Sequence, residues 1–267
     1  MKITESKNKK TEEIHTKSVE EIVDIINQED NTVADSVKKE LNNISEAVKL
    51  VVNSFNNEGR LFFIGAGTSG RLGIIQAAEC PPTFGTEPEM IQGIIAGSNE
   101  AVFKAKEGSE DREKDGYDIV KEKLSPKDVL VGISASGTTP FVKGALKAGK
   151  EIGCKTISIS CNKNAEISQL AENPIEVIVG AEILTGSTRM KSGTAQKMVL
   201  DMITTSALIK TGRVTGNLMT HLMPNSIKLK ERAIRILTEL TGLKKTDAKE
   251  ILEKHDYKVD KALKELR

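Results

Sequence analysis

The sequence predicts an α/β fold: a doubly wound, five-stranded parallel sheet with N-terminal helices and a small C-terminal helical appendage. Five short apolar runs rich in β-forming residues predict the strands, and turn residues bound each run. Helix-length segments separate the runs, which is typical of a parallel sheet covered on both faces. The runs are Leu61–Ile64, Met90–Ile95, Val129–Ile133, Thr156–Ser160 and Ile175–Val179. Five such strands suit the flavodoxin-like order 2-1-3-4-5.

The segment before the sheet has helical periodicity. Val19–Gln28 and Val33–Phe55 both place their apolar residues on one face, and Thr32 is a suitable N-cap for the second helix. We therefore expect two amphipathic helices here. Each needs cover for its apolar face, either from the sheet or from a second subunit.

Helical patterns also follow the sheet. Lys191–Lys210 predicts a long helix, Asn225–Leu240 predicts another, and Asp247–Lys254 and Val259–Leu266 predict two short charged helices. We accordingly divide the chain into three parts. They are an N-terminal helical arm (1–58), an α/β domain (59–215) and C-terminal helices with a small helical cap (216–267).

Composition excludes several classes of function. The 267 residues have a net charge of +1, so no overall field draws the chain to nucleic acid or to a membrane surface. No run reaches the roughly 18 apolar residues of a membrane span, and Met1–Lys10 lacks the apolar stretch of a signal peptide. The three cysteines have no metal-ligand spacing, and three histidines are too few for a histidine-rich metal site. We expect a cytoplasmic protein with buried thiols.

The first candidate site is the loop Gly65–Gly70, which follows a predicted strand and opens a helix. Its sequence, GAGTSG, matches the G-x-G-x-x-G pattern, but that pattern alone also fits a tight turn or a dinucleotide site. The hydroxyls matter more, because they lie where free N–H groups and the helix dipole favour an anion. Gly67, Thr68 and Ser69 are therefore candidate phosphate-binding residues.

The second candidate site is the loop Ser134–Thr139, which has the same context between a strand and a helix. Four hydroxyls in six residues are more than helix capping alone requires. The candidate phosphate-binding residues are Ser134, Ser136, Gly137, Thr138 and Thr139.

The predicted strand order brings the two loops together. Strands 1 and 3 are neighbours in a 2-1-3-4-5 sheet, and ligands bind in the crevice at the carboxyl ends of such strands. The loops contain no cationic residue and offer hydroxyls and backbone N–H groups instead. A phosphate monoester fits this set of donors better than a pyrophosphate does.

Two acidic positions are candidates for catalysis. Glu79 lies in an Ala-rich segment that Pro81 and Pro82 are expected to end sharply. Glu110 belongs to an acidic cluster at the start of the helix before the third strand, where acids are common anyway. From spacing alone, a catalytic pair and two unremarkable surface carboxylates both remain open.

Longer motifs carry a resemblance to a known family. The stretches Gly59–Gly85, with AECPPTFG at its end, and Leu184–Ile203, which begins LTGSTRMKSGTAQK, are the most specific. Shorter matches are Ile95–Asp111, Ser134–Val142 and the GNLM sequence at Gly216–Met219. Over about residues 18–240, the chain resembles the N-acetylmuramic acid 6-phosphate etherases. That family has the fold of sugar isomerase (SIS) domains, in agreement with the predicted sheet.

The resemblance implies a reaction and roles. The family removes D-lactate from N-acetylmuramic acid 6-phosphate by elimination and then adds water, giving N-acetylglucosamine 6-phosphate in cell-wall sugar recycling. Glu79 would protonate the departing lactyl oxygen, and Glu110 would remove the proton from carbon 2. The resemblance implies no metal or other cofactor, and a homodimer with sites at or near the interface.

Other interpretations stay open at this point. An aldose–ketose isomerase would also abstract a proton beside a carbonyl, and some related SIS domains are non-catalytic phosphosugar sensors. Arg189 and Lys191 could lie near the substrate, either of their own chain or across a dimer interface, or they could form a structural salt bridge. The arm also departs from the family, because Lys7-Asn8-Lys9 stands where an Arg-Asn-Pro stretch is usual.

Overall fold

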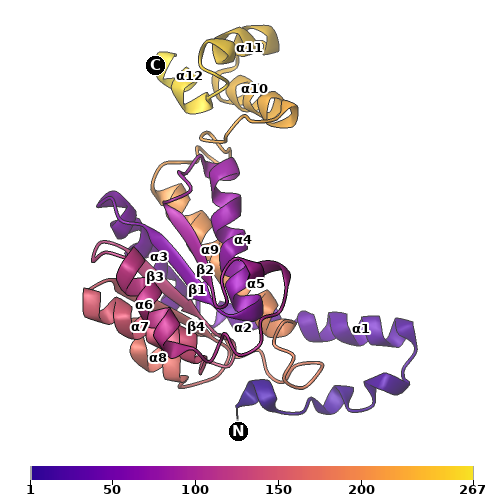
Figure 1. Cartoon of the computed structure of the whole chain (residues 1–267). Helices are drawn as coiled ribbons and strands as arrows, with labels where there is room; N and C mark the ends of the chain where they lie inside the picture. Colours follow the sequence, from indigo (N-terminus) through magenta and orange to yellow (C-terminus); the bar gives the residue numbers. More distant parts are fainter. Residues whose placement is uncertain (1, 267) are drawn as a thin grey trace.

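The computed structural model describes residues 2–266 and has the predicted sheet (Figure 1). Five parallel strands lie in the order β2-β1-β3-β4-β5, which confirms the expected arrangement. The strands are β1 (Leu61–Gly65), β2 (Ile91–Ile95), β3 (Val129–Ile133), β4 (Lys155–Ser160) and β5 (Asn173–Glu176). The last strand begins two residues before the apolar run that predicted it, because its pairing with β4 starts at Asn173.

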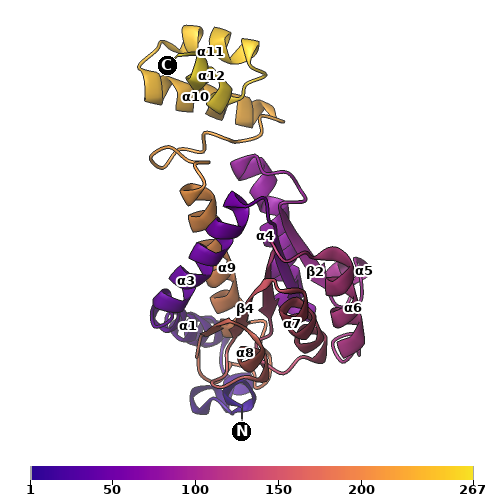
Figure 2. The ribbon, with the colours of Figure 1, turned by 90° about the vertical axis from the view of Figure 1, so that its left-hand side faces the viewer.

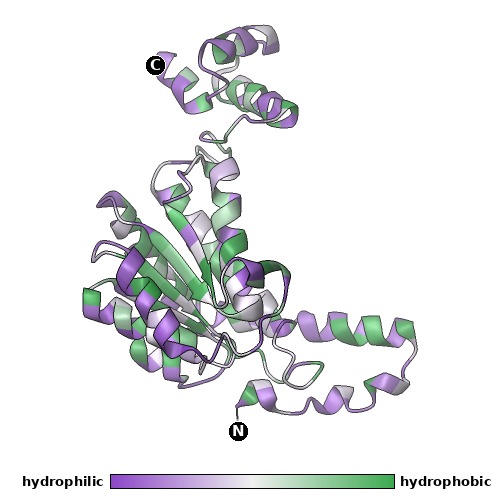
Figure 3. Ribbon diagram, in the orientation of Figure 1, coloured by the Kyte–Doolittle hydropathy of each residue, from purple (hydrophilic) through white to green (hydrophobic). Residues whose placement is uncertain are grey.

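Alternate residues of β1 serve two cores, one on each face of the sheet. Leu61 and Phe63 belong to the core beneath α3 (Leu41–Asn56), α4 (Gly67–Phe84) and α9 (Lys191–Lys210). Phe62 and Ile64 belong to the core on the other face. That core lies beneath α6 (Glu113–Lys123), α7 (Pro140–Ile152) and α8 (Glu166–Leu170). The period of two along a fully buried strand explains the continuous apolar runs in the sequence, and Figure 3 shows these strands as hydrophobic.

The N-terminal part has more elements than the periodicity predicted. Three short 3₁₀ turns, Ile3–Glu5, Lys9–Thr11 and Ile14–Thr16, precede α1 (Val19–Asp30). The expected single helix Val33–Phe55 is wrong, because it is divided into α2 (Val33–Lys38) and α3. At the break, the Glu40 carboxylate accepts hydrogen bonds from Glu176 N (3.3 Å) and Asn43 Nδ2 (2.7 Å), which holds the turn against β5. Thr32 precedes α2 without a side-chain capping bond.

The prediction that Pro81 and Pro82 end the first helix sharply is also wrong. Helix α4 continues through both prolines to Phe84 and ends at Gly85, whose φ of 59° is left-handed. Each proline lacks an N–H, so Ala77 and Ala78 lose helical donors, but the fixed φ of proline remains compatible with a helix. Gly85 N then donates to Pro81 O at 2.9 Å and closes the last turn.

The last helices form a cluster of their own, set apart from the sheet in two views (Figures 1 and 2). They are α10 (Ile227–Thr241), α11 (Lys245–Lys254) and α12 (Val259–Glu265), close to the predicted bounds. Their buried residues, among them Leu237, Leu252 and Ala262, pack on one another. Among the described residues, no helix is both long and apolar enough to cross a membrane.

Candidate active site

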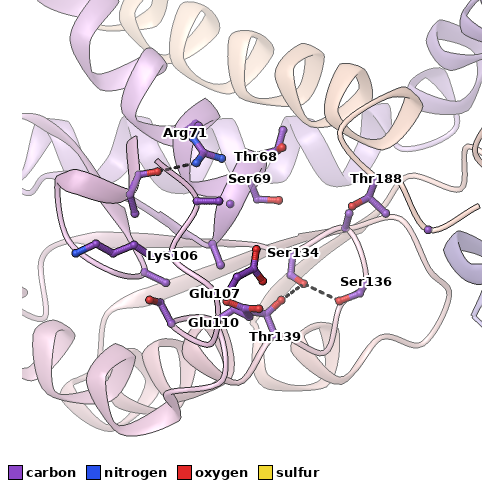
Figure 4. A pocket seen from close by; sticks show the side chains of 18 of the residues that line it. Thr68, Ser69, Arg71, Lys106, Glu107, Glu110, Ser134, Ser136, Thr139 and Thr188 are labelled. Atoms are coloured by element: carbon purple, nitrogen blue, oxygen red, sulfur yellow. Dashed lines mark hydrogen bonds between the residues drawn. The ribbon is translucent and has the colours of Figure 1, made fainter. Parts of the chain in front are cut away.

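The two hydroxyl-rich loops lie side by side at the carboxyl end of the sheet. Gly65 at the end of β1 pairs with Ile133 at the end of β3, so the loops that follow these strands start as neighbours. They share a cavity of about 310 Å³. Residues of both loops line it: Gly67, Thr68, Ser69, Ser134, Ser136 and Thr139. The expected meeting of the two loops is therefore present in the structure (Figure 4).

The first loop opens α4 without a side-chain cap. Ala66 is the N-cap residue and offers no side-chain acceptor, so the first N–H groups of the helix are left for a ligand. Gly67 has a φ of 52°, and a Cβ on Gly70 would lie 2.7 Å from Gly65 O, so both positions require glycine. The Ser69 hydroxyl donates to Gln196 Oε1 at 3.0 Å, which ties the loop to α9.

The second loop is held by its own hydroxyls. Ser134 Oγ lies 2.7 Å from Thr139 Oγ1 and 3.3 Å from Ser136 Oγ, and it accepts a hydrogen bond from Gly137 N at 3.0 Å. Gly137 has a φ of 72° and packs against Ala165, where a Cβ would come within 2.3 Å of the alanine methyl. Hydrogen bonds within the loop therefore fix the positions of its donors and acceptors.

Two of the candidate phosphate residues do not line the cavity. Gly137 shapes the loop from behind, and the Thr138 hydroxyl accepts a hydrogen bond from Lys2 Nζ at 2.7 Å. The N-terminal arm therefore contacts the second loop of its own chain.

Glu110 faces the cavity from the segment between β2 and α6. Its backbone carbonyl accepts a hydrogen bond from Phe141 N at 2.9 Å, which fixes it beside the start of α7. The side chain is half-buried, and within residues 2–266 it has neither an ion pair nor a hydrogen-bond donor. Glu107 lines the same cavity (Figure 4). An unpaired carboxylate in this place is free to accept a proton from a ligand held by the loops.

Glu79 does not reach this cavity in its own chain. It is exposed near the far end of α4 and lines a second hollow with Lys197, Asp201 and Asn217. At about 1.5 Å of rise per residue, it lies roughly 16 Å along the helix from Thr68. One chain therefore does not bring the two predicted carboxylates together.

Arg189 and Lys191 are placed differently from each other. Arg189 is exposed in the loop before α9. Lys191 is buried, and its Nζ donates to Glu29 Oε2 at 2.7 Å, as in the salt-bridge alternative. The backbone N–H groups of Lys191 and Ser192 donate to the buried Glu182, so the start of α9 is satisfied from within the protein.

The structure adds lining residues that sequence reasoning missed. Arg71, Lys106, Thr188 and Glu5 line the cavity (Figure 4 labels the first three). Arg71 donates to Ala101 O (2.7 Å) and Val102 O (2.9 Å), so it stabilises the loop around α5 (Glu100–Phe103). Arg71 directly follows the first loop, and Lys106 and Thr188 lie in stretches that carry the family resemblance. Of these four residues, Glu5 alone had no signal in the sequence.

The described residues contain no group of three or more His, Cys, Asp or Glu side chains that could hold a metal ion. All three cysteines are unpaired and buried. Burial raises the pKa of the Cys80 and Cys161 thiols to about 12 and that of Cys154 to about 11. At neutral pH these thiols are protonated, which makes them poor nucleophiles and poor metal ligands.

Comparison with known proteins agrees with this geometry. Residues 108–206 match the SIS domain model, and residues 43–150 match that of the glucokinase regulatory protein N-terminal SIS domain. A phosphoheptose isomerase structure from Neisseria gonorrhoeae has a TM-score of 0.55 and 19% identity, covering 71% of this chain and 98% of that one. The Vibrio vulnificus NanR protein complexed with ManNAc-6P has a TM-score of 0.52 and 16% identity. The match covers 83% of this chain and 70% of that one. The fold and the paired loops thus define a SIS domain.

Similar sequences narrow the SIS domain class to one enzyme family. An N-acetylmuramic acid 6-phosphate etherase from Clostridioides difficile is 48% identical over 98% of this chain and 86% of its own length. An etherase of the same name from Bacillus mycoides is 51% identical over 97% of this chain and 89% of its own length. The chain belongs to the N-acetylmuramic acid 6-phosphate etherase family, whose members are carbon–oxygen lyases.

Proposed function

We propose that the protein cleaves the D-lactyl ether of N-acetylmuramic acid 6-phosphate, giving N-acetylglucosamine 6-phosphate and D-lactate for amino-sugar recycling. The observation that carries the proposal is the unpaired Glu110 carboxylate facing a cavity between two hydroxyl-rich loops. Family membership at 48–51% identity over nearly the whole chain supplies the substrate and the bond that is broken. We place the protein in the cytoplasm, in keeping with three buried, unpaired thiols. Cell fractionation tests that location.

The loops would hold the phosphate. Thr68 and Ser69 stand at the open start of α4, and Ser134, Ser136 and Thr139 face them across the cavity. Hydroxyls and helix N–H groups donate to phosphate oxygens, and Arg71 and Lys106 line the same cavity. The sugar would then extend from this anchor towards Glu110.

Glu110 would act as the base. In the open-chain sugar, the proton on carbon 2 lies beside the aldehyde and is acidic. Its removal, with loss of the lactyl oxygen from carbon 3, forms the carbon 2–carbon 3 double bond. Water then adds its oxygen to carbon 3, and a proton returns to carbon 2. No cationic side chain of the described residues pairs with Glu110, so its carboxylate is available to take this proton.

Glu79 would supply the acid from a second copy of the chain. The lactyl alkoxide is a poor leaving group and needs a proton, yet Glu79 of the same chain lies roughly 16 Å along α4 from the loop. The face around Glu79 carries exposed apolar side chains, such as Ile75 (47% exposed) and Ile209 (45%). A homodimer whose interface includes both this face and the cavity would bring the Glu79 of one copy to the cavity of the other.

Incubation with N-acetylmuramic acid 6-phosphate in heavy water tests the activity. Lactate release with deuterium at carbon 2 of the product supports the etherase. Interconversion of hexosamine phosphates without lactate would show an isomerase, and binding without turnover would show a sensor. The Glu110→Gln variant should lose carbon 2 exchange. Full exchange in that variant would remove Glu110 as the base.

Mixing two inactive variants tests the shared site. Glu79→Gln and Glu110→Gln homodimers should each be inactive. If subunits exchange at random, half of the dimers become mixed and one site in each is intact, so about a quarter of the wild-type activity should return. No recovery, with mixed dimers confirmed by mass spectrometry of tagged chains, would mean that Glu79 does not act across the interface.

A further inference from the structure

The N-terminal arm forms one wall of the site. Thr4 is fully buried, and its N–H donates to Asn162 Oδ1 at 3.3 Å. Asn162 Nδ2 lies 3.0 Å from Thr4 Oγ1 and 3.2 Å from the carbonyl oxygens of Ala135 and Ser136. One amide therefore joins the arm to the second loop. Farther along, the Thr11 hydroxyl donates to Ile183 O at 2.8 Å, so the arm is also anchored to the segment before α9.

Glu5, directly after the buried Thr4, lines the same cavity as Glu110. Its carboxylate lies against Gly186, where an added Cβ would be 3.2 Å from Oε2. Within residues 2–266, no side chain or backbone group forms a hydrogen bond or ion pair with this carboxylate. Anchoring of Thr4 thus holds an unpaired negative charge at the rim of an anion-binding cavity.

The Glu5 side chain is exposed, so water solvates its charge in the empty cavity, but the charge repels a phosphate bound nearby. An idle carboxylate would only weaken binding of the ligand that the loops are arranged to hold. A carboxylate is an acceptor with no proton to donate at neutral pH, and it forms its strongest hydrogen bonds with neutral or cationic donors. A sugar phosphate offers neutral donors away from its phosphate, namely ring hydroxyls and, in an acetamido sugar, the amide N–H.

We infer that Glu5 is a specificity-determining residue that accepts hydrogen bonds from the hydroxyl or amide N–H donors of the sugar. The inference rests on the proposed function for the identity of the sugar phosphate. The loops select the phosphate, and Glu5 selects a ligand that has donors beyond it. The Glu5 carboxylate repels inorganic phosphate and forms no hydrogen bond with it. A sugar phosphate is repelled through its phosphate group but also donates hydrogen bonds to Glu5.

The test compares Glu5→Ala with Glu12→Ala, which removes an exposed glutamate from the same arm outside the cavity. Glu5→Ala should raise KM for N-acetylmuramic acid 6-phosphate roughly tenfold, the effect of losing one hydrogen bond to a charged group. The inhibition constant of inorganic phosphate should stay unchanged or fall, because a repulsive charge is gone. Glu12→Ala should change neither constant.

Other outcomes overturn the inference. An unchanged or lower KM in Glu5→Ala would mean that the carboxylate binds no part of the sugar. A parallel rise in KM and in the phosphate inhibition constant would mean that the change only displaced the arm. Calorimetric titration with N-acetylglucosamine 6-phosphate gives the same comparison without turnover, so failure of the etherase activity and failure of this inference are distinguishable.

Discussion

The buried ion pair between Lys191 and Glu29 gives the sharpest prediction about stability. The Lys191 side chain is 3% exposed and that of Glu29 6%, and the pair joins α9 to the end of α1. Glu29 also accepts hydrogen bonds from Asn8 (2.9 Å) and Lys10 (3.0 Å), so the same carboxylate holds the N-terminal arm. Lys191→Met removes the buried cation and nearly preserves its volume.

The expected loss follows from the state of Glu29. Burial alone would raise its pKa, but hydrogen bonds from Lys191 and Lys10 outweigh burial and lower the pKa from 4.5 to about 2. That difference corresponds to roughly 3 kcal/mol of preference for the charged form in the folded protein. Breaking a buried pair by removing one partner typically costs about 3–5 kcal/mol. We therefore expect Lys191→Met to lower the free energy of unfolding by about 3 kcal/mol.

Urea denaturation at pH 7 measures this loss, and a double-mutant cycle with Glu29→Gln isolates the pair. The double variant should be more stable than the sum of the single losses predicts, because neither partner is left charged and unpaired.

The stability that Glu29 contributes depends on pH in a definite direction. The pKa of Glu29 is depressed in the folded state, so its stabilisation is complete above about pH 4.5 and is lost as the pH falls towards 2. The difference between wild type and variant should shrink over that range.

The reasoning fails if Lys191→Met costs less than about 1 kcal/mol, the usual value of an exposed pair. A small loss of stability combined with a large rise in KM would instead place Lys191 beside the substrate. That outcome would favour the alternative in which the TGSTRMKSGT block binds the sugar phosphate.

Two further predictions concern the loops and the thiols. The double variant Ser134→Ala, Ser136→Ala should raise KM for the phosphorylated substrate tenfold or more, with little change in circular dichroism. The control variant Thr246→Ala, at an exposed position, should leave KM unchanged. An unchanged KM in the double variant would place the phosphate elsewhere. Because burial raises the pKa of Cys80 to about 12, that thiol and the other two should react slowly with a disulfide reagent at pH 8 until the protein unfolds. A Thr246→Cys variant, exposed on α11, provides the fast-reacting control, and a native cysteine that matches its rate would contradict the buried placement.

Much of the fold could be read from local sequence patterns. Both faces of a parallel sheet are buried, so every residue of a strand tends to be apolar. The strands can therefore be recognised as short apolar runs in the sequence. Lys191–Lys210 was predicted with the bounds that the structure has. The two loops were also predictable, since glycines with left-handed φ such as Gly67 and Gly137 stand where strand turns into helix.

Other features depended on contacts between distant residues. The break between α2 and α3 is stabilised where Glu40 meets Glu176, and no local pattern at Glu40 predicts that meeting. Lys191 finds its partner 162 residues earlier in the chain. Its burial therefore followed from the packing of α9, not from its position in a motif.

The sequence by itself determined the family, the five strands and the two hydroxyl-rich loops, because each leaves a pattern in neighbouring residues. Only the tertiary structure decided which carboxylates share the cavity. Glu79 is separated from the loop by the length of a rigid helix, while Glu5 is brought to it by the anchoring of Thr4 on Asn162. A carboxylate has the same local signature in either place, and the packing of the elements that carry it determines what it faces.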